Sequence, residues 1–136
     1  MLTKEQLKNR HTLITALRSG TYAQDTGYLR TPEGFCCQGV ACDLFKDRVG
    51  GEWVPQTGFW GFSIPGVPKN DSSFDILWSN GIRNLVGVDD LTSSQLVNMN
   101  DGNSSRHKTT DHYTIDERCT FDEIADCLEY LTLGGL

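Results

Sequence analysis

The sequence predicts an α+β fold: an N-terminal helix, a small antiparallel hairpin or sheet, short helices and a C-terminal helix around one core. Helical periodicity of apolar residues near both ends predicts the helices, and two short strand-like segments flanking Pro32-Glu33-Gly34 predict the hairpin. The length of 136 residues is the commonest size of a single domain. We therefore predict one domain over residues 1–136, with a polar insertion loop at residues 103–118.

The first helix is expected over residues 4–18. Thr3 and Gln6 have the spacing of a capping box, in which each side chain bonds the backbone N–H of the other residue. Gly20 is expected to end the helix, because glycine adopts the left-handed conformation that follows many helices. Four residues recur at the spacing of one buried helical stripe: Leu7, His11, Ile14 and Leu17.

The middle of the chain predicts a hairpin followed by irregular structure. Residues 28–30 and 35–37 should pair across the turn at residues 32–34. Residues 40–45 form a short apolar run that could be a helix packed on that hairpin. From residue 51 to 88 we predict long loops held by aromatic and aliphatic anchors. These anchors are Trp53, Phe59, Trp60, Phe62, Ile64, Val67 and Trp78.

Two helices are expected in the C-terminal part. The pair Thr92 and Gln95 and the pair Thr120 and Glu123 both have capping-box spacing. The first helix should run over residues 93–99 and close at Gly102, and the second should run over residues 121–131. The second helix has one apolar face, made of Ile124, Cys127, Leu128 and Leu131. The polar stretch between the two helices is long enough to be functional or disordered.

The charge distribution disfavours binding to duplex nucleic acid. Residues 1–48 carry seven Lys and Arg against five acids, whereas residues 49–136 carry five against thirteen, for a net charge of -6. Affinity for a duplex comes mainly from neutralising its phosphates, so a duplex-binding protein normally has the opposite balance. We predict no duplex nucleic acid partner.

Compartment and redox state follow from simple patterns. No apolar leader-like segment opens the chain, and no apolar run approaches membrane-spanning length, so we predict a cytoplasmic protein with no membrane partner. The five cysteines are an odd number and include no Cys-x-x-Cys pair. We predict reduced thiols, no bound metal and no cofactor.

Four segments carry a family resemblance. Residues 16–24 read Ala-Leu-Arg-Ser-Gly-Thr-Tyr-Ala-Gln, and residues 34–44 read Gly-Phe-Cys-Cys-Gln-Gly-Val-Ala-Cys-Asp-Leu. Residues 96–102 read Leu-Val-Asn-Met-Asn-Asp-Gly, and residues 120–126 read Thr-Phe-Asp-Glu-Ile-Ala-Asp. Together they resemble a family of small bacteriophage and prophage proteins, which implies a phage origin, the host-cell cytosol and a shared fold, but no catalytic residues. Gln38 departs from the family pattern, which usually has Leu there.

The cysteines suggest two kinds of chemistry, a metal site and a nucleophile. Cys36, Cys37 and Cys42 could form a zinc site with Cys119 or His11, but neighbouring residues on a strand point to opposite faces, so we predict no such site. Cys37 or Asp43 beside His11 could serve a small hydrolase or transferase, which we keep as an alternative function. The position of His11 on the apolar stripe favours a core imidazole instead.

The remaining candidate site combines aromatic rings with guanidinium groups. An aromatic stacking surface could be formed by Trp53, Phe59, Trp60 and Phe62. Phe59 or Trp60 would then stack on a base while Arg30, Arg83 or Arg106 meets a phosphate, because this combination suits nucleotides. The same rings could instead fill the core. We predict a non-enzymatic phage protein that binds a host protein or a small nucleotide-like signal and so counteracts host defence. A structural or regulatory phage accessory protein is the further alternative, and a homo-oligomer is left open.

Overall fold

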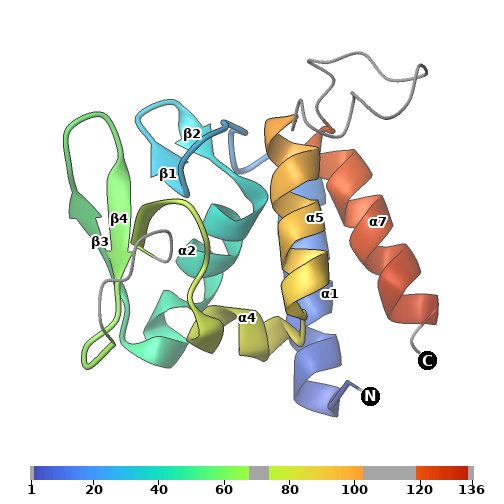
Figure 1. Ribbon diagram of the computed structural model, residues 1–136. Coiled ribbons are helices and arrows are strands. Elements are labelled where there is room, and N and C mark those ends of the chain that lie inside the picture. The colour runs from blue at the N-terminus through green and yellow to red at the C-terminus, as the bar shows by residue number, and fades with distance from the viewer. Residues whose placement is uncertain (1, 68–73, 103–118, 135–136) are drawn as a thin grey trace.

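A computed structural model of the chain describes residues 2–67, 74–102 and 119–134. Over these residues the fold is α+β, with a helix at each end and a four-stranded antiparallel sheet at one side (Figure 1). The elements are α1 (Lys4–Arg18), β1 (Arg30–Thr31), β2 (Gly34–Phe35), α2 (Cys37–Val49), β3 (Glu52–Pro55), β4 (Trp60–Ser63), α4 (Asn80–Val86), α5 (Asp90–Asp101) and α7 (Phe121–Gly134).

Helix α1 has the predicted bounds and the predicted capping box. Gln6 N donates to Thr3 Oγ1 and Thr3 N donates to Gln6 Oε1, both at 3.0 Å. The predicted stripe is partly wrong, because His11 is exposed and Leu7 is only half-buried. The buried face is rotated about the helix axis from the predicted face by about the angle between successive residues, and it includes two polar side chains. It consists of Asn9, Arg10, Leu13, Ile14 and Leu17.

The polar residues of α1 are buried because they cap another helix. The last carbonyls of a helix have no partner within that helix. Gln6 Nε2 donates to Asn84 O at 2.9 Å, and Asn9 Nδ2 donates to Leu85 O at 2.8 Å. Arg10 donates to the carbonyls of the next two residues, from Nε to Val86 O and from Nη2 to Gly87 O. Side chains of α1 therefore donate hydrogen bonds to the carbonyls at the C-terminal end of α4.

The sheet has the order β2-β1-β4-β3, with every neighbouring pair antiparallel. The predicted hairpin at Pro32 is confirmed as β1 and β2. The prediction of long loops over residues 51–88 is wrong for residues 52–55 and 60–63, which pair as β3 and β4, and for residues 80–86, which form α4. Aromatic cross-strand pairs stabilise such strands, and Trp53 lies opposite Phe62. Gly and Pro residues in and beside β3 and β4 hide the strand pattern in the sequence.

Helix α2 begins earlier than predicted, so Cys37 is not on a strand. Cys36 caps the helix, with its Sγ accepting from Gly39 N at 3.3 Å. The assumption that Cys36 and Cys37 alternate across a strand is therefore wrong. Gly39 lies directly against the Leu29 carbonyl, where a Cβ would clash with backbone. The helix ends at Gly50, which has the left-handed φ of 66°.

The C-terminal helices confirm one predicted cap and correct the other. Thr120 and Glu123 form the capping box of α7, with bonds of 2.8 and 3.2 Å. Helix α5 begins three residues before the predicted start, because Asp89 accepts from Thr92 N at 2.8 Å and caps the helix instead of Thr92. Residues 103–118, predicted as a polar insertion loop, lie outside the described residues.

One core joins all the helices to the sheet. Buried apolar side chains come from α1, α2, α4, α5 and α7, together with Leu29 before β1 and Phe62 on β4. In Figure 1, α1 and α7 lie side by side, and α2 lies between them and the sheet. Of the helices in the described ranges, none combines the length and hydropathy of a membrane-spanning segment.

Candidate functional site

The sheet register gathers an arginine and three aromatic rings. Arg30 on β1 lies opposite Phe35 on one side and Trp60 on the other. Its guanidinium carbon is 4.3 Å from the ring centroid of Trp60, 5.2 Å from that of Phe35 and 5.4 Å from that of Trp53. All three distances are within the range of cation–π attraction. We call these four residues the arginine–aromatic cluster.

Arg30 has no polar partner among the described residues. The other arginines of the described ranges all bond carbonyl, amide or carboxylate oxygens, and these are Arg10, Arg18, Arg48 and Arg83. The half-buried side chain of Arg30 is instead held by ring faces alone. A guanidinium carries five N–H donors in one plane. No hydrogen bond to another described residue uses these donors of Arg30.

The cluster has an inner and an outer part. The rings of Phe35 and Trp53 pack against the core, and Trp53 also makes an edge contact with Phe62, with ring centroids 5.1 Å apart. Trp60 is half-buried and, among the described residues, is not part of the core or of the shell packed on it. The cluster therefore contacts the core through Phe35 and Trp53, whereas Trp60 lies outside the core.

A carboxylate on α2 fixes the inner rings. Asp43 Oδ1 accepts from Trp53 Nε1 at 3.0 Å, and Asp43 Oδ2 accepts from the hydroxyl of Tyr22 at 2.7 Å. Lys46 Nζ forms an ion pair with Asp43 Oδ1 at 3.2 Å. The Tyr22 ring contacts the Phe35 ring edge-on, at 5.1 Å and 89°. Asp43 thus orients the two aromatic residues that position Phe35 and Arg30.

These contacts set the ionisation of the pair. Burial raises the pKa of Asp43, but hydrogen bonds from Tyr22, Trp53 and Lys46 outweigh it, so the pKa lies below its usual value. Burial, and then the hydrogen bond to Asp43, raise the pKa of Tyr22. At neutral pH the network therefore consists of a carboxylate and a protonated phenol.

A second pair of aromatic rings belongs to residues that are close to the cluster residues in the sequence. Tyr28 and Phe59 are stacked, with centroids 4.4 Å apart and planes inclined by 7°. Phe59 immediately precedes Trp60, and Tyr28 is two residues before Arg30. Neither ring belongs to the core cluster or to the residues packed on it within the described ranges. This pair adds an outer aromatic surface.

The predicted site residues are only partly brought together. Arg30 and Trp60 are in contact, and Phe59 adjoins them but is stacked on Tyr28. Arg83 is on α4, where it pairs with Asp90 at the start of α5, so it is not in the cluster. Arg106 lies outside the described residues. Of the other two rings expected in the stacking surface, Trp53 is in the cluster and Phe62 is buried behind it. Phe35 was missed as a member of the site, although its aromatic side chain on an expected strand was a usable signal.

The chain matches the profile of a known protein family. A family profile described as "Domain of unknown function (DUF8296)" matches residues 3–132. The chain belongs to the DUF8296 family. No curated protein and no solved structure matches it. The DUF8296 match includes both the arginine–aromatic cluster and the helices of the core, but it assigns no reaction to them.

The DUF8296 fold does not assemble the alternative Cys/His arrangement from the residues considered for it. The Cys37 thiol is buried and directed at Leu96 O, 3.7 Å away, and burial raises its pKa well above the usual value. His11 is exposed and lines a groove of about 370 Å³ between α1 and α7. Asp43 is bonded to the partners given above. In the described ranges, no three His, Cys, Asp or Glu side chains lie together as a metal site.

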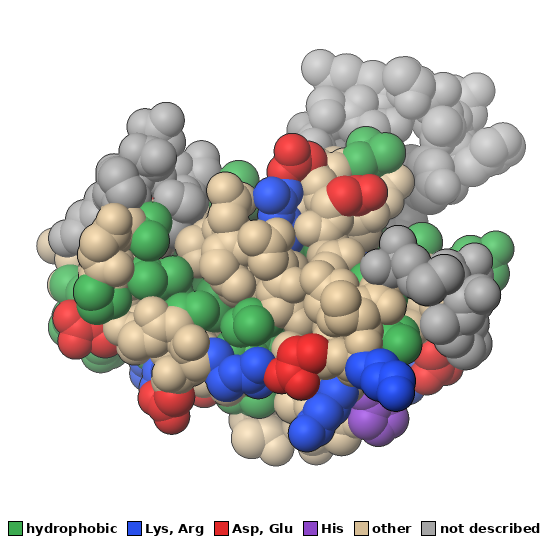
Figure 2. Space-filling view, turned by 90° about the horizontal axis from the view of Figure 1, so that it is seen from below, with side chains coloured by type: hydrophobic (Ala, Val, Ile, Leu, Met, Phe, Trp, Pro, Cys, Tyr) green, Lys and Arg blue, Asp and Glu red, His purple; other side chains and the backbone are tan. Residues whose placement is uncertain are grey.

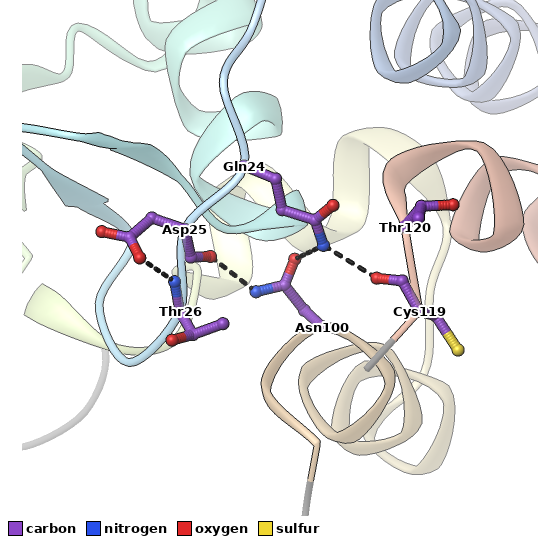
Figure 3. A pocket seen from close by; sticks show the side chains of 6 residues that line it. All are labelled: Gln24, Asp25, Thr26, Asn100, Cys119 and Thr120. Atoms are coloured by element: carbon purple, nitrogen blue, oxygen red, sulfur yellow. Dashed lines mark hydrogen bonds between the residues drawn. The ribbon is translucent and has the colours of Figure 1, made fainter. Parts of the chain in front are cut away.

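A separate polar pocket of about 220 Å³ lies where the loop after α1 meets α5 and α7 (Figure 3). Gln24 Nε2 donates to Asn100 Oδ1 at 3.0 Å and to Cys119 O at 2.8 Å, while Asn100 Nδ2 donates to Asp25 O at 2.8 Å. These groups join three segments of the DUF8296 domain to one another. The pocket is lined by Gln24, Asp25, Thr26, Asn100, Cys119 and Thr120.

The face of the domain seen from below carries mixed charge. Figure 2 shows Lys and Arg side chains next to Asp and Glu side chains, with hydrophobic groups between them. Long-range steering of an anion needs an extended field of one sign. On this face of the described DUF8296 domain, an anion would have to be bound by local contacts.

Proposed function

We propose that this DUF8296 domain is a non-enzymatic binding protein of phage origin that takes up a small nucleotide-like signal of the host through Arg30. The phage origin rests on the resemblance of residues 34–44 and 120–126, and counteracting a host defence system is the role that such binding would serve. One observation carries the ligand assignment. The guanidinium of Arg30 is held among three aromatic rings and has no carboxylate partner within the described residues.

The chemistry of Arg30 suits a phosphate. Its donors form a rigid planar fork that matches two phosphate oxygens, and the rings restrict its rotamers before binding. Restriction in the unbound state lowers the entropy lost on binding. The chain has a net charge of -6, so long-range forces oppose an anion. A preorganised local cation with aromatic neighbours overcomes that opposition at short range.

The two alternatives have less support. A Cys/His-dependent hydrolase or transferase would need Cys37 or Asp43 beside His11, and each of these residues has a different environment. A structural or regulatory accessory protein remains compatible with the fold, but no feature of the described residues favours it. A host protein is the second kind of partner for Arg30, through a carboxylate or phosphate on its surface.

The test is calorimetric titration of nucleoside mono-, di- and triphosphates into the wild type and four variants. Arg30→Gln should weaken binding by about tenfold or more. Arg30→Lys should recover little, because lysine keeps the charge but loses the planar fork. Arg48→Gln is the matched control, since Arg48 is an exposed guanidinium paired with Glu5, and it should leave affinity unchanged.

Trp60→Ala separates a binding role from a core role. If Trp60 supports the ligand site, the variant should lose about tenfold in affinity and keep its folded fraction in a thermal melt. A ring that filled the core would instead cost about 3 to 5 kcal/mol of stability. Unfolding of Trp60→Ala, or the absence of binding by every nucleotide to the wild type, would leave only the version with a host protein partner.

A further inference from the structure

The stacked pair Tyr28 and Phe59 points to how the ligand's ring is recognised. We propose that the base of a nucleoside phosphate stacks on the outer face of Tyr28, with Phe59 behind it, while its phosphate meets Arg30. This inference rests on the proposed function of Arg30 and adds a residue and a ligand class to it. The ligand class is a base-bearing phosphate, as opposed to a phosphate without an aromatic ring.

Tyr28 is the most exposed of the three outer rings, which are Tyr28, Phe59 and Trp60. The Trp60 ring has the guanidinium of Arg30 over it, and Phe59 has one face covered by Tyr28. Tyr28 is 37% exposed, whereas Phe59 and Trp60 are half-buried. On this proposal the stacking role falls to Tyr28 instead of Phe59 or Trp60. Phe59 supports the stack, and Trp60 supports the cation.

The backbone holds Tyr28 and Arg30 at a fixed spacing. Leu29 between them is fully buried, its N–H donates to Asp75 O at 2.7 Å, and its carbonyl accepts from Cys36 N at 3.1 Å. Tyr28 and Leu29 lie in a bend just before β1, so chain connectivity limits the spacing, and the Cα atoms of Tyr28 and Arg30 are at most roughly 7 Å apart. A ribose bridges a comparable gap between a base and its 5′-phosphate.

The support behind Tyr28 is also fixed. The N–H of Gln56 donates to the carbonyl of Phe59 at 2.9 Å, which closes the tight turn between β3 and β4. Gly58 in this turn has a φ of 83°, a conformation that favours glycine. Because the turn holds the Phe59 backbone, Tyr28 is already stacked before any ligand arrives. A base adding to this stack orders no further side chain.

The experiment compares ligands with and without a base. Adenosine, guanosine, cytidine and uridine 5′-monophosphates and ribose 5-phosphate are titrated into the wild type, Tyr28→Leu, Tyr28→Phe and Arg30→Gln. The wild type should prefer at least one monophosphate over ribose 5-phosphate by about tenfold, the effect of one stacked base. Tyr28→Leu should abolish that preference, and Tyr28→Phe should keep it. Tyr130→Leu, at an exposed tyrosine on α7, should change nothing.

The outcomes separate the two proposals. If Arg30→Gln loses binding of every monophosphate while Tyr28→Leu keeps the wild-type preference, the stacking inference is wrong and the phosphate site stands. If Arg30→Gln binds as the wild type does, the proposed function fails. A second readout needs no loss-of-ring variant: the Tyr28 ring protons, assigned with Tyr28→Phe, should shift upfield with the preferred monophosphate and not with ribose 5-phosphate. The absence of that shift would also overturn the inference.

Discussion

The guanidinium Nε of Arg10 donates to the carbonyl oxygen of Val86 at 2.6 Å, and its Nη2 donates to the Gly87 carbonyl at 2.7 Å. Arg10 is on α1, and the two carbonyls mark the end of α4. The side chain is only 8% exposed, and burial lowers its pKa, with the nearby carboxylate of Asp89 opposing this. A buried cation thus serves as the cap of a helix to which it does not belong.

Replacing Arg10 should be costly because it leaves buried carbonyls without donors. Arg10→Met keeps most of the apolar stem, yet we expect it to lower the free energy of unfolding by about 2 to 3 kcal/mol. Denaturant unfolding measures this. Arg18→Met is the control on the same helix, since Arg18 pairs with exposed Asp126 and Glu129 and should change stability much less than Arg10→Met does. Equal losses in the two variants would contradict the capping role.

Two glycines within helices, Gly39 on α2 and Gly81 on α4, should respond in opposite directions to alanine. A Cβ at Gly39 would clash with the Leu29 backbone, whereas a Cβ at Gly81 has its nearest neighbour 3.6 Å away. Gly81→Ala should raise stability by about 0.5 to 1 kcal/mol, the usual gain within a helix. Gly39→Ala should lower it by about 1 to 3 kcal/mol or more. Thermal melts give both signs, and a stable Gly39→Ala would refute the close approach.

Gln38 has a structural reason for departing from the expected leucine. Its buried side chain donates to Ser93 O at 2.9 Å and accepts from Trp78 N at 3.1 Å. Gln38→Leu should therefore lose about 1 to 3 kcal/mol of stability, since these buried groups are left unpaired. Gln56→Leu, at an exposed position, should stay within about 0.5 kcal/mol. If Gln38→Leu proves as stable as the wild type, the neighbouring side chains repack without the hydrogen bonds.

The Tyr22–Asp43 pair predicts a pH effect at the alkaline side. The folded pKa of Tyr22 is raised by burial and by Asp43, so its contribution to stability is complete below the ordinary tyrosine pKa of about 10 and is lost as the pH rises above it. At about pH 10.5, in folded protein, Tyr22→Phe should give the same tyrosinate absorbance as the wild type. A lower tyrosinate absorbance in Tyr22→Phe than in the wild type would contradict a protonated Tyr22.

The capping-box spacing predicted the start of a helix correctly where no earlier residue caps the helix instead. Thr3 and Thr120 cap as expected, but Asp89 displaces Thr92, because an earlier cap extends the helix by another turn. The error at His11 has a different origin. Periodicity counts apolar residues, whereas the buried face of α1 is set by carbonyls of α4, which the α1 sequence does not contain. Long-range capping of this kind leaves no mark in a local pattern.

The site was predicted in kind but not in arrangement. Aromatic residues and arginine were recognised as a combination, and Arg30 and Trp60 do lie in contact. Which arginine joins which ring depends on strand register, and β3 and β4 were expected as loops, so the pairing of Arg30 with Trp60 could not be derived. The partnership of Arg83 with Asp90 likewise depends on the turn between two helices.

The packing of α1 against α7 has a consequence for synthesis on the ribosome. A chain emerges from its N-terminus, and domains complete their folding only when the segments that pack together are all available. Leu13, Ile14 and Leu17 are buried in the finished core, to which Ile124 and Leu128 of α7 belong. Helix α1 therefore leaves the ribosome long before its packing partner. During that interval its apolar face is accessible to chaperones and to other nascent chains.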